Sequence, residues 1–142
     1  MKREEITTLV KYRLEQAKIA LADAQFLLDG NRSPQSIVNR SYYAMFYAAL
    51  ALMQNIGKAP SKHAGVISLF DTEFVVKEIF PKELSRDFHK AFEMRQVADY
   101  KTTEPVSREK AKETLMKANR FVEAAENYIK NLLKHLKKEE QN

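Results

Sequence analysis

Apolar residues recur at helical spacing along most of the chain. Two long stretches show the clearest pattern, with apolar positions alternately four and three residues apart, which places them on one face of a helix. Each stretch therefore predicts an amphipathic helix that buries one stripe against a core. The positions are Val10, Leu14, Ala17, Leu21, Ala24 and Leu28 in the first stretch, and Ala111, Leu115, Ala118, Val122, Ala125, Ile129, Leu132 and Leu136 in the last.

Residues that break or cap helices divide the chain into five predicted helices. Glycine, proline, asparagine and serine favour helix ends through their backbone preferences or their capping side chains. The markers are Gly30, Asn31, Pro34, Gly57, Ser61, Pro81 and Ser107. They predict helices over about residues 3–29, 34–56, 61–70 and 81–99, and from 107 onward, with a less regular patch at 71–80.

The short connections make consecutive helices antiparallel neighbours. The sequence therefore predicts an all-α fold, an up-down antiparallel four-helix bundle with an additional short helix. A chain of 142 residues is expected to form one domain. We expect that domain to cover residues 1–142, with a core over about 5–135 and a C-terminal tail that frays.

The predicted second helix is unusual because its run SYYAMFYAALALM is apolar all the way round. A bundle helix needs only one apolar stripe, so a helix without a polar face is either central or covered a second time by a partner. We predict a homodimer in which this helix contributes to the contact. The longest apolar run, Tyr42 to Met53, is too short to span a bilayer, so we expect no membrane partner.

Composition and charge indicate where in the cell the protein is expected and limit the reactions and partners open to it. The chain has no cysteine, which excludes a thiolate nucleophile and favours a cytoplasmic location. Its first residues, MKREEITTLV, lack the apolar core of a signal peptide. The net charge of +5, from 24 basic and 19 acidic residues, permits nucleic-acid contact without requiring it.

The common signatures of enzyme sites are absent from the sequence. There is no GxGxxG, no GxxxxGK[ST] and no HExxH pattern. The three histidines, His63, His89 and His135, are scattered at spacings that do not suggest a metal site. We therefore expect no metal and no cofactor, with His63 exposed at a helix start and His89 at the surface.

An arginine interrupts the apolar stripe of the predicted fourth helix. Leu84, Phe88 and Ala91 are spaced four and three apart, and the next step of four reaches Arg95. A cation on a buried stripe is costly unless another group pairs with it or the protein uses it. The position therefore marks Arg95 as a candidate for function.

Two interpretations of the Arg95 segment are open. Arg95 and Asp99 are four residues apart and can form an ordinary helix ion pair, with Tyr100 closing the helix end. Alternatively, Arg95 faces a groove and binds an anion, with Asp99 orienting it and Tyr100 at the rim. Arg95 and Tyr100 share a face only if the helix ends near Asp99 and the chain folds back.

A second candidate cluster lies on the predicted second helix. Arg40, Tyr43 and Tyr47 fall on one face, with Asn39 beside them. A guanidinium followed by two phenols can bind a phosphate or stack a base. The alternative is that both tyrosines pack in the core and only their hydroxyls reach the surface.

Three segments, NRSYYAMFYAALALM, SKHAGVISLF and MRQVADY, resemble the HEPN domain family in their order and spacing. The resemblance covers roughly residues 5–135. It implies a small all-helical dimeric protein, of the kind encoded beside minimal nucleotidyltransferases in toxin-antitoxin-like modules. Many HEPN toxins are metal-independent ribonucleases that use an arginine and a histidine separated by four to six residues, at a site formed across the dimer.

The resemblance assigns Arg95 to the family's arginine, but Tyr100 occupies the position of the histidine. In one branch of the family the partner attaches AMP to a tyrosine, and here Thr102 stands at that position. A phenol with a pKa near 10 is a poor base at pH 7. The leading expectation is thus a dimeric HEPN-type protein that binds a nucleotide or RNA phosphate and works with a minimal nucleotidyltransferase. The alternatives are an active ribonuclease with Arg95 and Tyr100 as catalytic residues, and a non-catalytic structural interaction module.

Overall fold

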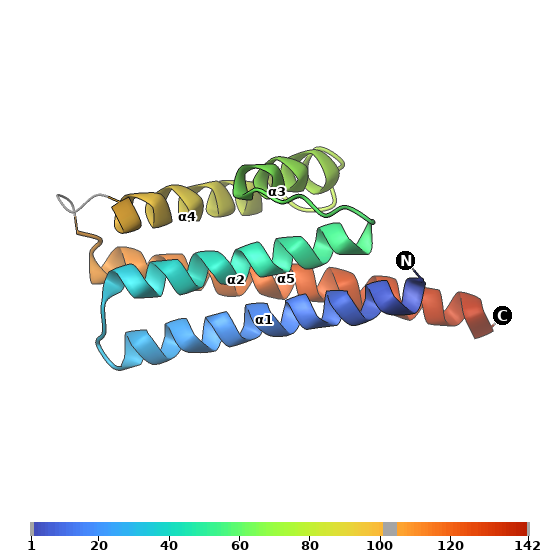
Figure 1. Cartoon of the computed structure of the whole chain (residues 1–142), viewed down its shortest axis with the longest axis horizontal. Coiled ribbons are helices and arrows are strands. Elements are labelled where there is room, and N and C mark those ends of the chain that lie inside the picture. The colour runs from blue at the N-terminus through green and yellow to red at the C-terminus, as the bar shows by residue number, and fades with distance from the viewer. Residues whose placement is uncertain (1, 101–104, 142) are drawn as a thin grey trace.

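The computed structural model describes the backbone of residues 2–100 and 105–141, and the side chains of residues 2–97 and 105–140. The described chain is helical, which confirms the all-α prediction. Four long helices lie alongside one another, and the short helix α3 sits near the start of α4 (Figure 1). The elements are α1 (Arg3–Asp29), α2 (Pro34–Asn55), α3 (His63–Phe70), the π-helical turn η1 (Asp71–Val75), α4 (Lys82–Tyr100) and α5 (Arg108–Gln141).

Helix α2 is the centre of the bundle. It packs against α1, α3, α4 and α5, which explains why its sequence lacks a polar face. The central position of α2 within one chain is therefore enough to explain its apolar run, and no partner chain is needed for that. The homodimer stays a prediction. One stripe of α2 remains partly exposed, formed by Tyr43, Phe46, Tyr47 and Leu50.

The helix ends follow the local sequence, with one exception. Asn31 takes a positive φ of 54° after α1, and Gly57 takes 76° after α2. The backbone N–H of Lys110 donates to Ser107 Oγ at 3.1 Å, so Ser107 caps α5 as predicted. The predicted cap at Ser61 is wrong, because α3 begins one residue later, with Lys62 at the N-cap and no side-chain capping bond.

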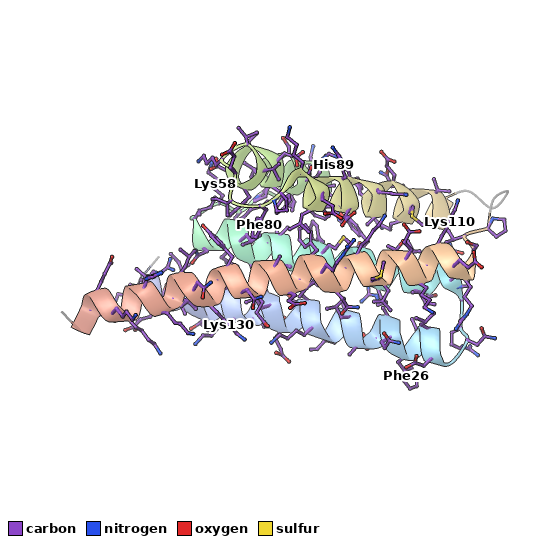
Figure 2. The ribbon with its side chains drawn as sticks, turned by 180° about the vertical axis from the view of Figure 1, so that it is seen from behind. Phe26, Lys58, Phe80, His89, Lys110 and Lys130 are labelled. Atoms are coloured by element: carbon purple, nitrogen blue, oxygen red, sulfur yellow. The ribbon has the colours of Figure 1, made fainter. Side chains whose placement is uncertain are left out.

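Phenylalanines form the centre of the core beneath α3 and α4. The ring of Phe70 lies 5.0 to 5.9 Å, between centroids, from four other phenylalanine rings. Those rings belong to Phe74, Phe80, Phe88 and Phe121. Figure 2 shows Phe80 between the helices and Phe26 pointing outward from α1, in agreement with exposed fractions of 8% and 77%.

Across the described residues, no helix is long and apolar enough to cross a membrane.

Candidate functional site

Arg95 lies at the point where the buried stripe of α4 reaches the surface. Phe88 and Ala91 are buried, and Arg95 on the next turn is partly exposed. The central carbon of its guanidinium is 5.6 Å from the ring centroid of Tyr42 and 5.3 Å from that of Tyr43. Such distances are typical of cation–π contacts, which attract the cation to the faces of the rings. The Tyr42 and Tyr43 rings of α2 thus stabilise the Arg95 cation, which the apolar residues of the α4 stripe cannot do.

His63, the first residue of α3, also lies against these rings. Its Nδ1 forms a hydrogen bond of 2.7 Å with the Tyr42 hydroxyl. Its ring stacks on that of Phe46, with 4.4 Å between centroids and 15° between planes. The side chain is partly buried, so the expectation of an exposed histidine at a helix start is wrong.

Arg95 and His63 converge on the same two tyrosines from different helices. The imidazole centroid lies 5.7 Å from the Tyr42 ring and 5.9 Å from the Tyr43 ring. Burial, and then the positive charge of Arg95, lower the pKa of His63, so the imidazole is neutral at pH 7. We call Tyr42, Tyr43, His63 and Arg95 the Arg95 site.

Burial also decides the state of Tyr42. It raises the pKa of this phenol, and the opposing effect of Arg95 is smaller. Tyr42 therefore stays protonated and serves the site as a neutral hydrogen-bonding group.

The second predicted cluster adjoins this site through Tyr43. Arg40 donates from Nε and Nη2 to Asn39 Oδ1, at 3.3 and 3.1 Å. Its guanidinium carbon is 5.2 Å from the Tyr43 centroid, and the Tyr43 and Tyr47 centroids are 5.9 Å apart. Tyr43 is thus contacted by both Arg40 and Arg95, which gives a continuous strip of cations and aromatic rings along α2.

A hollow of about 390 Å³ continues the strip beyond Arg40, at the start of α2. It is lined by Leu27, Ser33, Gln35, Ser36, Asn39 and Arg40. Hydroxyl groups and a guanidinium suit the oxygens of a phosphate.

Three predicted positions cannot be compared with this geometry. The side chains of Asp99 and Tyr100, and the whole of Thr102, lie outside the described residues. The role of Asp99 as the orienting partner of Arg95 and that of Tyr100 at the rim therefore stay predictions.

His89 is a surface residue, as predicted, and has a structural contact. Its Nε2 is 2.7 Å from one oxygen of Asp71, and Ser85 donates to the other oxygen at 2.5 Å. These bonds join α4 to η1, in the layer of the molecule where Figure 2 labels His89. Among the described residues, no three His, Cys, Asp or Glu side chains gather in a way that could hold a metal ion.

Comparison with known proteins agrees with this architecture. The HEPN domain model matches residues 10–128. The UPF0332 protein of Thermotoga maritima is 37% identical over 124 residues, which cover 87% of this chain and 93% of that protein. The protein named Putative toxin MJ0605 of Methanocaldococcus jannaschii is 34% identical over 131 residues, covering 92% of this chain and 93% of the relative.

A second protein of the same archaeon, named Putative toxin MJ0142, is 36% identical over 99 residues, covering 68% of this chain and 67% of that one. The chain belongs to the HEPN domain family.

Proposed function

We propose that this HEPN chain is the toxin-like component of a two-protein module and binds an RNA or nucleotide phosphate at the Arg95 site. The observation that carries the proposal is the guanidinium of Arg95, supported by the faces of two tyrosines and adjacent to a histidine. The names of two relatives support the toxin-like role.

The geometry suits a phosphate for a physical reason. A guanidinium offers a planar set of donors that can bind two phosphate oxygens at once. Stacking on aromatic faces orients this group without neutralising its charge.

Two partners belong to the proposal. The first is a minimal nucleotidyltransferase, which the family resemblance implies. The second is another copy of this chain, which would cover the partly exposed stripe of Phe46, Tyr47 and Leu50 on α2 and bring two Arg95 sites near one groove.

Binding of a short single-stranded RNA should depend on Arg95. In fluorescence anisotropy with a 5′-labelled oligoribonucleotide, Arg95→Ala should weaken binding about 10- to 100-fold, because a charge-assisted hydrogen bond contributes about 1.5 to 3 kcal/mol. AMP and inorganic phosphate should compete with the oligonucleotide. Circular dichroism of the variant checks that the fold is retained.

Arg86→Ala is the matched control, because it removes the same charge from an exposed position on the same helix. It should change affinity less than twofold, in line with the weak contribution of distant charges at physiological salt. Equal losses in the two variants would mean that general positive charge, and not the Arg95 site, binds RNA. Absence of binding by the wild type would refute the proposed function.

A further inference from the structure

We propose that a pocket between α4 and α5 binds the indole ring of a tryptophan from a partner protein. This pocket, which we call the α4–α5 pocket, shares no residue with the Arg95 site, so the inference does not rest on the proposed function. The chemistry of the ligand follows from the apolar lining, from one buried carboxylate and from the lysines around it.

The α4–α5 pocket has a volume of about 390 Å³, within the range of sites that hold small organic groups. Lys110, labelled in Figure 2, lines it near the start of α5. An aromatic ring that enters the pocket would leave water and pack against an apolar surface. That surface comes from α4 and from the residues that precede α5, namely Ala91, Met94, Val97, Pro105 and Val106.

Two polar residues of the pocket wall are buried. Asp87 is 6% exposed and Thr114 is 4% exposed, and Ser41 is the other buried polar residue that the structure describes. Oδ2 of Asp87 accepts no hydrogen bond from the described residues. Lys117 Nζ lies 3.9 Å from Oδ1 and Arg120 Nη2 lies 3.6 Å from Oδ2, and both distances exceed that of a hydrogen bond. The carboxylate therefore retains acceptor capacity for a donor that enters the pocket.

The charges near Asp87 do not offset the burial of its carboxyl group. Burial raises the pKa of Asp87, and the opposing effects of Lys117 and Arg120 are smaller. A hydrogen bond from a ligand to the carboxylate would favour the charged form and offset part of this cost. The pocket thus favours a ligand that carries a hydrogen-bond donor.

The charges of the pocket wall favour a neutral donor over a cation. Three lysines line the pocket, Lys90, Lys110 and Lys117. The carboxylate of Glu113 is already paired with Lys117 at 3.1 Å, and that of Glu93 is exposed to water. A further ammonium or guanidinium would be repelled by the lysines. Indole combines a large apolar ring with one neutral N–H donor, so it suits both the lining and the buried carboxylate.

The occupant is expected to come from another protein. The 142 residues contain no tryptophan, so neither they nor a second copy of them can supply the indole. Tryptophan is among the residues that most often anchor protein–protein interfaces. Lys90 and Lys110 are exposed at the pocket, so acidic residues beside the tryptophan would pair with them. The partner segment that we infer is therefore a tryptophan flanked by acidic residues.

Indole itself is the first probe, and benzofuran is the matched control compound, because an oxygen replaces the N–H group in a ring of similar shape. Addition of indole to the full chain should shift the backbone amide signals of Ala91, Met94 and Thr114 in heteronuclear NMR spectra. Indole should bind about 10- to 100-fold more tightly than benzofuran, the usual effect of a hydrogen bond to a charged group. Equal affinities, or shifts confined to other parts of the bundle, would overturn the assignment.

Asp87→Asn removes the charged acceptor and keeps the shape of the side chain. It should weaken the binding of indole by about tenfold and leave the binding of benzofuran unchanged. Asp23→Asn makes the same change at an exposed position of α1 and should bind indole as the wild type does. Undiminished indole binding by a folded Asp87→Asn protein would overturn the role of the carboxylate. The comparison of the two compounds on the wild type holds even where the variant does not fold.

A peptide distinguishes a partner protein from a free indole compound as the source of the ring. The probe is a capped pentapeptide with one tryptophan between two pairs of glutamates. It should bind about tenfold or more tightly than indole, and its affinity should fall as salt is added, because the lysines of the pocket attract its carboxylates. The same peptide with phenylalanine in place of tryptophan should bind about tenfold more weakly, since it lacks the N–H donor. Equal affinities of the tryptophan peptide and indole would assign the pocket to a small indole compound and overturn the partner, and failure of both to bind would refute the pocket as a site.

Discussion

Ala48→Glu is expected to unfold the chain. Ala48 on α2 is fully buried, in the core shared by the central helix and its neighbours. A carboxylate placed there without a partner costs several kcal/mol even when it is neutralised by a proton. Since native stability is typically about 5 to 15 kcal/mol, the variant should lose its cooperative unfolding transition or show a greatly lowered Tm. Circular dichroism during urea and thermal denaturation measures this effect.

The matched control is Ala22→Glu, which adds the same group at an exposed position of α1. Its stability should stay within about 0.5 kcal/mol of the wild type, as for most surface changes. A folded Ala48→Glu protein with wild-type stability but a smaller assembly in sedimentation would contradict the central position of α2. That result would mean that a partner, and not the chain itself, covers Ala48.

Phe70→Ala should produce the second large effect. The ring is 1% exposed and touches four other phenylalanine rings, so its removal leaves a cavity that a packed core fills only in part. Substitutions of this kind cost about 3 to 5 kcal/mol. For a chain of this length the loss should lower Tm by on the order of 10 °C or more.

Phe26→Ala is the control for Phe70→Ala, because it removes the same type of side chain from a position that is 77% exposed. It should change the free energy of unfolding by less than about 0.5 kcal/mol. Similar losses in the two variants would show that ring burial beneath α3 and α4 does not determine stability. Urea denaturation of both variants under one set of conditions makes the comparison.

Much of the fold could be predicted because helix periodicity and helix ends are local properties. The first helix was predicted over residues 3–29, and α1 covers the same residues. Ser107 was predicted to cap the last helix, and it does. At Ser61 the same reasoning fails, because a capping oxygen must accept a hydrogen bond from a backbone N–H of the first helical turn, and α3 begins at His63 with Lys62 at the N-cap.

The candidate site could be predicted only in part, because it is assembled from three helices. The interrupted stripe of α4 marks Arg95, since spacing along one helix is visible in the sequence. Tyr42 lies within the apolar run of α2, so the sequence indicates only that it is buried. Its contribution to the site comes from its hydroxyl, which bonds to His63, and from its ring face, which contacts Arg95. His63 gives no periodic signal, and its contact with Tyr42, 21 residues away in sequence, follows from how α3 packs on α2.

We propose that an RNA phosphate binds between Arg95 and His63. The most direct measurement is a map of chemical-shift changes by heteronuclear NMR, recorded while a short 2′-O-methyl oligoribonucleotide is added to the wild-type chain. We expect the largest changes on the Arg95 guanidinium, the His63 imidazole and the Tyr42 and Tyr43 rings. Saturable binding that leaves these four groups unchanged, with the shifts concentrated elsewhere on the bundle, would contradict it.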